Sequence, residues 1–479
     1  MQNRSIFPRV TVAEFHNKLT RKHSTFIYLQ RHLTPKQQEE VNNLGVPGLF
    51  FEPDMRRVYP YGGIFAHSIG YVGVDNQGLA GIEKSFDTKL QDPQDEKPLQ
   101  LSLDLRIQSM LRDELSKTIG EFQAIGGVGV VLDITSGEVL AMTSMPEFDP
   151  NQPGRASDDA RFNRATLGVY EMGSTFKTFT MAAALENNVV GMKGGYDASR
   201  PIHMGGYTIS DAHPEGRWLS VPEIFAYSSN IGTAKMGLDL GGKRQREFLK
   251  SLGFFEPVKL EMPELGKPIT PRNWSELTTM TVSYGHGISV SPMHLINAIA
   301  AITGDGLLQP MTLVKNGNAN KPKGSRVAAK STVEDVRDLL RLVVLHGTGK
   351  SANALGYEVG GKTGTAEKIT SGVYKKDSKV TSFIGVFPMS NPKYAILVMV
   401  DEPRGNKSTY GFATGGWISA PVAGRVVQRM APLLAMKPNF SPPDAKVEAY
   451  WGGAQAREKA AQLARENEMT KEAIRAASF

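Results

Sequence analysis

The chain has 479 residues, which indicates at least two domains, and its 40% hydrophobic and 22% charged residues are typical of a folded globular protein. The net charge of +7 indicates a mildly basic surface that can attract anionic partners such as phospholipid or cell-wall polymer, but the sequence has no basic tract typical of nucleic-acid binding. The sequence has no cysteine, which excludes disulfides and thiolate chemistry, and no apolar window of about 18 residues that could span a membrane.

The N-terminal region, residues 1–98, is mixed in composition and punctuated by proline and glycine. A helix is predicted to begin at Pro35 with Thr34 as its N-cap. The Gly-rich stretch 66–90 favours turns and short strands. The charged, proline-flanked stretch 91–98 is typical of a linker and predicts a domain boundary there.

Residues 99–440 are predicted to form a second domain whose sheet is assembled from both ends of that region. Asp104 is expected to cap the first helix. Residues 126–147 carry two apolar runs around a turn and predict a β-hairpin. Three more strands are predicted within residues 356–403, the last two of them joined by a tight turn.

Helices are predicted between these two groups of strands, so the order of elements indicates an α+β fold with helices covering a sheet. One helix is expected to end at Gly304, and another to open with a capping box of Ser331 and Glu334. A last helix is predicted over residues 418–436. The composition changes in the tail, residues 441–479. Its stretch 454–477 is rich in Ala, Glu, Lys and Arg and favours a weakly ordered terminus over an exposed or partner-binding helix.

The first motif with chemical potential is Ser174-x-x-Lys177, which opens an apolar helix. A serine at a helix start is usually a cap, and Ser-x-x-Lys recurs at Ser390 in a predicted turn. Ser174 and Lys177, however, lie one turn apart and can share a helix face. Burial would lower the pKa of the Lys177 amine, so that it could act as a base beside a nucleophile.

The second motif is Ser228-Ser229-Asn230, in a polar segment before a predicted helix. Ser-x-Asn recurs at Ser351, so an ordinary polar loop is the common explanation of such a pattern. The position before a helix nevertheless allows the side chains of Ser228 and Asn230 to project into a cleft.

The third motif is Lys362-Thr363-Gly364-Thr365, the only K-T-G in the chain. It follows two glycines on a predicted strand, where glycine often marks the close approach of a ligand or another backbone. The hydroxyls of Thr363 and Thr365 are expected on one side of the strand because strand side chains alternate. With the charge of Lys362 they would form a receptor for a carboxylate.

Together and in this order, the three motifs resemble those of the penicillin-binding protein family. The resemblance extends over nearly the whole chain: residues 70–87 look like the non-catalytic N-terminal region of class B members, and residues 285–302 and 415–430 like their transpeptidase domain. Residues 56–83 most resemble the division-specific, septal branch. The sequence departs from the family at Met172, where many relatives carry proline.

The resemblance implies an elongated N-terminal pedestal, of the dimerisation-like type, over residues 1–98 and a transpeptidase domain over residues 99–440. That domain would contain a five-stranded antiparallel sheet flanked by helices. The chain is expected to be N-terminally truncated, without the helix that anchors such proteins at the periplasmic face of the bacterial inner membrane. Expected partners are peptidoglycan stem peptides ending in D-Ala-D-Ala, β-lactam antibiotics, a septal glycosyltransferase and membrane proteins of the divisome.

The resemblance also implies acyl transfer through Ser174, with no metal or cofactor. Lys177 would be the general base, Ser228 a proton relay, and the backbone N–H groups of Ser174 and Thr365 an oxyanion hole. The implied catalytic residues are Ser174, Lys177, Ser228, Asn230 and Lys362, and the implied oxyanion or substrate-binding residues are Thr363, Gly364 and Thr365.

Other interpretations stay open at this point. A D,D-carboxypeptidase or β-lactamase would use the same motifs, but no segment like the deacylating Glu motif of class A β-lactamases lies between Asn230 and Lys362. An elongation-type transpeptidase and a β-lactam-binding sensor or scaffold are further alternatives. His67, Glu83 and His286 are expected to be structural, and residues 408–417 are expected to form a wall beside the third motif.

Overall fold

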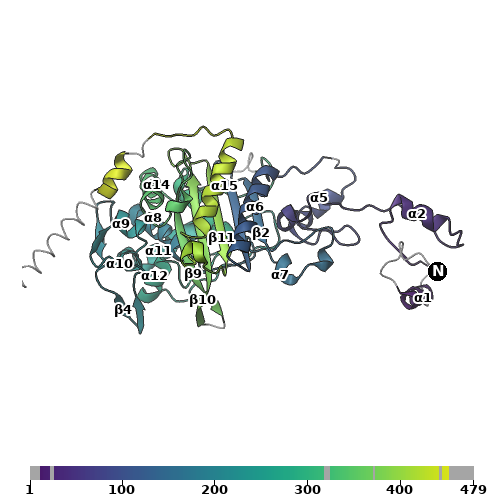
Figure 1. Cartoon of the computed structure of the whole chain (residues 1–479), viewed down its shortest axis with the longest axis horizontal. Helices are drawn as coiled ribbons and strands as arrows, with labels where there is room; N and C mark the ends of the chain where they lie inside the picture. Colours follow the sequence, from purple (N-terminus) through teal and green to yellow (C-terminus); the bar gives the residue numbers. More distant parts are fainter. Residues whose placement is uncertain are drawn as a thin grey trace, which may run out of the picture.

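The computed structural model describes residues 11–21, 26–95, 97–317, 324–370, 373–441 and 445–452. The molecule is elongated, with a sheet and its helices in one part and the N-terminal helices α1 and α2 at the far end (Figure 1). Within these described ranges, no helix has both the length and the apolar character needed to cross a bilayer.

The N-terminal part is built from short helices: α1 Val12–Leu19, α2 Pro35–Asn42, η1 Gly62–Phe65, α3 Ala66–Ile69, α4 Gly81–Ser85 and α5 Asp87–Gln91. Thr34 caps α2 as predicted, since its hydroxyl accepts a hydrogen bond from the Gln37 backbone N–H at 3.3 Å.

The prediction of short strands in residues 66–90 is wrong. The stretch forms three helices and a single isolated bridge between Val72 and Gly78. Its glycines serve close helix packing instead: Gly70 has φ +79°, and a Cβ there would lie 1.9 Å from the carbonyl oxygen of Ala80.

His67 and Glu83 lie in packed positions within this N-terminal part. The Nε2 atom of His67 is 2.8 Å from the carbonyl oxygen of Ala160, and burial lowers its pKa to about 4. Glu83 pairs with Arg57 at 2.9 Å. Both residues therefore have structural partners, as expected.

One five-stranded antiparallel sheet organises the larger part of the molecule, with the strand order β2-β1-β11-β10-β9. Its strands are β1 Gly126–Asp133, β2 Val139–Met145, β9 Gly360–Thr370, β10 Val373–Phe387 and β11 Tyr394–Asp401. The early hairpin pairs with the late strands through β1 and β11, with Gly129 opposite Val398. The predicted sheet from both ends of the region is confirmed.

Helices cover both faces of this sheet (Figure 1). Strand β11 shows how the faces divide, because Val398 packs into the cluster of α6 and α15 whereas Leu397 and Met399 pack into the cluster of α8, α13 and α14. On the face covered by α6 and α15, Arg425 of α15 pairs with Glu114 of α6 at 2.6 Å. The covering helices are α6 Leu105–Glu121, α8 Lys177–Glu186, α13 Pro292–Thr303, α14 Lys330–Leu345 and α15 Ser419–Leu433.

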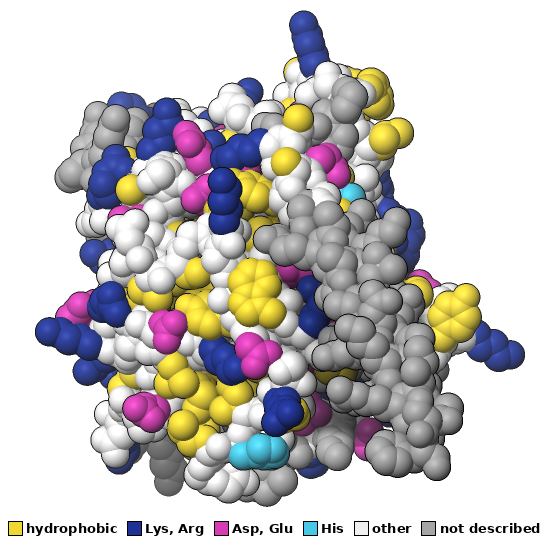
Figure 2. All heavy atoms as spheres, turned by 90° about the vertical axis from the view of Figure 1, so that its left-hand side faces the viewer, with side chains coloured by type: hydrophobic (Ala, Val, Ile, Leu, Met, Phe, Trp, Pro, Cys, Tyr) yellow, Lys and Arg dark blue, Asp and Glu magenta, His cyan; other side chains and the backbone are white. Residues whose placement is uncertain are grey.

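The remaining elements are short or lie in the helical region beyond α8. They are η2 Pro153–Arg155, α7 Asp158–Arg161, η3 Gly173–Phe176, β3 Gly195–Asp197, β4 Ile202–Met204, β5 Tyr207–Ile209, β6 Trp218–Ser220, α9 Val221–Ala226, α10 Asn230–Leu240, α11 Gly242–Ser251, α12 Glu276–Ser283, β7 Leu307–Leu308, β8 Ser325–Arg326, η4 Lys350–Ala352 and η5 Lys407–Thr409. The left-hand side of the molecule in Figure 1 presents hydrophobic side chains among basic and acidic ones (Figure 2).

The predicted helix ends are partly right. Asp104 caps α6 and Gly304 ends α13, as predicted. The capping box of Ser331 and Glu334 is wrong, because α14 already begins at Lys330 and makes no side-chain cap of its own.

A carboxylate from another helix replaces that predicted cap. Glu186, at the end of α8, accepts hydrogen bonds from the backbone N–H of Ala329 at 2.9 Å and from the hydroxyl of Thr332 at 2.6 Å. A tertiary contact therefore supplies the hydrogen-bond acceptor at the start of α14.

The C-terminal tail is partly described. Residues 445–452 form a helix with Val447 and Trp451 buried against the body of the protein. Residues 453–479, the rest of the predicted tail, lie outside the described residues.

Candidate active site

The first motif lies where η3 leads into α8. Ser174 is inside the 3₁₀ turn and makes no side-chain cap, so the expected capping role is wrong. The turn is held by Thr175, whose hydroxyl donates to the carbonyl oxygen of Met172 at 2.9 Å. Gly173 has φ +54°, and a Cβ there would lie 2.7 Å from the carbonyl oxygen of Thr365. Glycine thus lets the first motif touch the strand of the third.

Two buried lysines meet at one serine hydroxyl. Lys177 and Lys362 are both 0% exposed. Ser228 Oγ accepts from Lys177 Nζ at 3.1 Å and from Lys362 Nζ at 3.0 Å. Lys177 Nζ also donates to Asn230 Oδ1 at 2.7 Å and to the carbonyl oxygen of Ser228. The structure therefore brings all three motifs together around one hydroxyl.

The backbone of Ser228 is in an unusual conformation. Its φ is +61°, in the left-handed region, which costs a non-glycine residue about 1–3 kcal/mol. In this conformation the hydroxyl of Ser228 accepts hydrogen bonds from both lysines. An observed strained residue whose side chain bridges two buried amines is typical of a functional site.

The same burial sets the charge of the two amines. Burial holds the pKa of Lys177 well below its ordinary value, the positive charge of Lys362 lowers it further, and Asp211 acts in the opposite direction. Burial also lowers the pKa of Lys362 to about 7. The lowered pKa favours the neutral form of the Lys177 amine, which can take a proton.

Asp211 completes the second motif and was not predicted from the sequence. Its Oδ2 accepts from the hydroxyl of Ser229 at 2.7 Å, and its Oδ1 accepts from the backbone N–H groups of Asn230 and Ile231, the latter at 3.0 Å. This carboxylate sits at the N-terminus of α10, where the helix dipole favours negative charge. No spacing rule points to Asp211, because it lies in a separate loop 18 residues before Ser229.

The third motif runs along β9, at the edge of the sheet. The hydroxyl of Thr363 is 2.7 Å from that of Thr348, and Thr365 Oγ1 accepts from the backbone N–H of Gly415 at 3.1 Å. Gly415 also lies against Gly364, since a Cβ on Gly415 would be 2.5 Å from the Gly364 carbonyl oxygen. Gly415, within the segment 408–417, therefore lies against this strand, where the segment was expected.

Aromatic side chains project from that flanking segment. Tyr410 is 80% exposed, and the ring of Phe412 stacks on that of Trp417 with centroids 6.4 Å apart. The ring of His286 lies 5.2 Å from that of Tyr284. Burial and the nearby charge of Lys177 lower the pKa of His286 to about 4, so it is neutral at pH 7.

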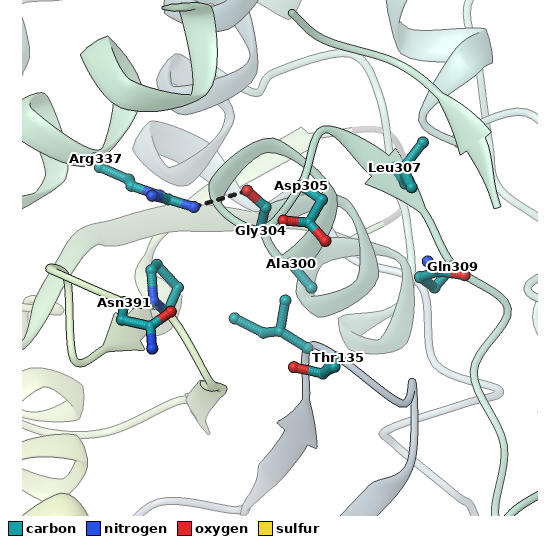
Figure 3. Close-up of a pocket in the computed structure, with 10 residues that line it drawn as sticks. Thr135, Ala300, Gly304, Asp305, Leu307, Gln309, Arg337 and Asn391 are labelled. Carbon is teal, nitrogen blue, oxygen red and sulfur yellow. Dashed lines mark hydrogen bonds between the residues drawn. The ribbon is translucent and has the colours of Figure 1, made fainter. Parts of the chain in front are cut away.

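A separate cavity of about 230 Å³ lies away from the motifs. It is bounded by the turns of the two hairpins, at Thr135 and Asn391, and by the end of α13, where Arg337 donates to the carbonyl oxygen of Gly304 at 2.7 Å (Figure 3). No residue of the three motifs lines it. The chemistry is therefore assigned to the motif cluster and not to this cavity.

The motif cluster has the parts that acyl transfer requires. Ser174 offers a hydroxyl at a turn, Lys177 a buried amine, and Ser228 a hydroxyl linked to both lysines. The two edge-strand hydroxyls and Lys362 supply polar groups for an anionic end of a substrate. This arrangement fits nucleophilic catalysis with an internal base.

Comparison with known proteins agrees with this chemistry. Residues 127–428 match the penicillin-binding protein transpeptidase domain, and residues 4–102 match the penicillin-binding protein dimerisation domain. A probable peptidoglycan D,D-transpeptidase FtsI of Caulobacter vibrioides is 41% identical over 416 residues, covering 85% of this chain and 71% of the relative.

Solved structures show the same likeness. The transpeptidase domain of penicillin-binding protein 3 from Burkholderia pseudomallei aligns with a TM-score of 0.64 at 32% identity, over 73% of this chain and 99% of that one. Penicillin-binding protein 3 from Mycobacterium tuberculosis in complex with aztreonam aligns with a TM-score of 0.73 at 28% identity, over 81% of this chain and 92% of that one. From its motifs, its fold and these matches, the chain belongs to the class B penicillin-binding proteins, with a transpeptidase and a dimerisation domain.

Proposed function

We propose that this protein is a serine-type peptidoglycan D,D-transpeptidase that cross-links stem peptides during septal wall synthesis and is acylated by β-lactams. The observation that carries the proposal is the hydroxyl of Ser228 between two buried lysine amines, beside the turn that holds Ser174. The relatives named as peptidoglycan D,D-transpeptidases and the β-lactam complexes of similar structures support the same activity.

Acylation begins with attack of Ser174 Oγ on the carbonyl of the penultimate D-Ala. The hydroxyl proton passes to the neutral amine of Lys177, which Asn230 orients. The resulting oxyanion accepts hydrogen bonds from the backbone N–H groups of Ser174 and Thr365, each worth about 3 kcal/mol. Ser228 relays a proton to the leaving nitrogen, the C–N bond breaks, and terminal D-Ala departs.

Acyl transfer then regenerates the enzyme. An amine of a second stem peptide attacks the ester on Ser174 and gives up a proton to Lys177. The new amide forms as the C–O bond breaks, and Lys177 returns the proton to the departing Ser174 Oγ. Lys362, Thr363 and Thr365 hold the terminal carboxylate during the first half of the cycle. The two peptides and these side chains supply every atom and proton that the two steps require.

The domain roles form part of the proposal. Residues 1–98 serve as a non-catalytic pedestal, residues 99–440 as the transpeptidase domain and residues 441–479 as a tail. The protein acts at the periplasmic face of the inner membrane with a septal glycosyltransferase and divisome membrane proteins. The pedestal has exposed apolar side chains, such as Phe50 at 85% and Met55 at 80% exposure. They support the binding of a protein partner to the pedestal.

Ser174 is tested by labelling with a fluorescent penicillin. We expect the unaltered chain to form a stable adduct whose mass maps to the peptide that contains Ser174, and Ser174→Ala to remain unlabelled because the attacking oxygen is gone. Ser390→Ala is the matched control, since Ser390 belongs to the other Ser-x-x-Lys pattern but lies in the β10–β11 turn. Labelling of Ser174→Ala would contradict the assignment, and rapid loss of label from the unaltered chain would indicate a hydrolase.

The two lysines predict a pH profile for acylation by a β-lactam that carries a carboxylate. The pKa of Lys362 is about 7, so its positive charge disappears above that pH and the second-order rate constant should fall there. On the acidic side the constant should fall as Lys177 becomes protonated.

Stopped-flow labelling from about pH 5 to about pH 9 measures that profile. Lys362→Arg is the control, because its guanidinium stays charged and should remove the alkaline fall even where the rate is lower at every pH. A profile of the unaltered protein that stays level up to about pH 9 would contradict the role given to Lys362.

Asp211→Asn tests the support of the second motif. The amide cannot accept all the hydrogen bonds of the carboxylate, so the loop of Ser229 and Asn230 should shift and the acylation rate should fall by about ten-fold. The melting temperature should change little beside this loss. Asp158→Asn, with a 98% exposed side chain, is the control expected to acylate normally. An unchanged rate in Asp211→Asn would show that the carboxylate is dispensable for positioning.

The septal role is tested in the bacterium that encodes the chain. Depletion should give long, undivided cells, because cross-linking at the septum would stop while side-wall synthesis continues. Division should return with a plasmid copy of the unaltered gene or Ser390→Ala, but not with Ser174→Ala. Round or swollen cells would instead favour an elongation-type enzyme.

A further inference from the structure

We propose that residues 445–452, the C-terminal helical segment, act as a clamp that positions the second and third motifs, with Trp451 as the positioning residue. The inference rests on the proposed function, because the motifs it positions are those of the transpeptidase. In Figure 1 this segment is a yellow helix near α9 and α14. Trp451 is 8% exposed and Val447 3% exposed, which is unusual for side chains near the end of a chain.

Trp451 first contacts the residue that precedes the second motif. Its ring meets the ring of Tyr227 edge to face, with centroids 5.5 Å apart. Tyr227 follows the last turn of α9 and is bonded directly to Ser228, the residue with a left-handed backbone. A strained conformation persists only where its surroundings fix it, so the position of Tyr227 bears on the position of the Ser228 hydroxyl.

Trp451 also contacts the segment that supports the third motif. Its ring stacks on His346, with centroids 4.9 Å apart and planes 4° apart. His346 ends α14, and two residues later Thr348 places its hydroxyl 2.7 Å from that of Thr363. The backbone N–H of Thr348 also donates to the carbonyl oxygen of Ala226, at the end of α9. One indole therefore contacts Tyr227, next to the second motif, and His346, near the residue that contacts the third motif.

A hydrogen bond and an ion pair fix the segment on the surface of α14 and its end. Glu448 Oε2 lies 3.0 Å from His346 Nε2, and Lys446 Nζ lies 2.7 Å from Asp338 Oδ2. Between them, Val447 packs with Leu342 in the same cluster as Trp451. These contacts set the rotation of the segment so that its indole faces Tyr227 and His346.

The consequence is a positioning role without contact to substrate. Removing the indole frees Tyr227 and His346 together, and a misplacement of about 1 Å at reacting groups can cost about 10²-fold in rate. The chemical step should suffer, while the first encounter with a β-lactam should not. A purely structural end cap would instead affect stability alone.

The test separates the acylation rate constant from the initial binding constant in the full chain, using stopped-flow reaction with a fluorescent penicillin. Trp451→Ala should lower the rate constant by about ten-fold and leave the binding constant within about two-fold. Trp451→Phe keeps an aromatic ring and should recover to within about two-fold of the unaltered protein.

Two controls and a second variant complete the design. Ala449→Gln changes an exposed position of the same segment and should acylate normally. Phe122→Ala removes a buried ring on the opposite face of the sheet and should lower the melting temperature without lowering the acylation rate constant. Glu448→Gln removes the carboxylate that His346 contacts and should lower the rate constant by about two- to five-fold, even where Trp451→Ala does not fold.

The outcomes distinguish the two levels of inference. Normal acylation by folded Trp451→Ala, or by Glu448→Gln where Trp451→Ala does not fold, overturns the clamp alone. An equal loss of rate in Phe122→Ala at a matched melting temperature also overturns it, because stability would then explain the effect. Absence of any acylation in the unaltered chain contradicts the proposed function. It therefore also contradicts the clamp, which rests on that function.

Discussion

Two buried lysine amines share one serine hydroxyl, and the rest of the site follows from that constraint. Two full positive charges so close together and so deeply buried would be expensive, so burial favours loss of a proton from at least one of them. Two effects lower the pKa of Lys177, because the charge of Lys362 adds to the effect of burial. The architecture thus makes a base from a residue that is ordinarily an acid at neutral pH.

The fold supplies that constraint by bringing three distant segments together. Strand β9 fixes Lys362 at the sheet edge, the turn before α8 fixes Lys177, and the loop before α10 fixes Ser228. Two of these segments adopt a positive φ at the point of approach, at Gly173 and Ser228. Such conformations persist because packed layers on both faces of the sheet leave the backbone no alternative arrangement.

The sequence predicted what is encoded locally. Thr34 and Asp104 could be predicted as caps, and the strands could be predicted from apolar runs and turns, because these signals act over a few residues. The start of α14 was misassigned because its capping group, Glu186, comes from another helix. Ser174 was expected to be a cap because the sequence does not distinguish a 3₁₀ turn from the first turn of an α-helix.

The same division applies to the site. Its motif residues could be predicted because each motif is a short pattern of side chains that act as a unit. Asp211, Thr348 and Trp451 could not, since each reaches the motifs only through a tertiary contact and has no fixed spacing from them. These three residues nevertheless aim the hydroxyls and amines that the motifs contribute. Substitutions outside the motifs can therefore change the rate of acylation while every motif residue is kept, because the rate depends on the placement of those groups as much as on their identity.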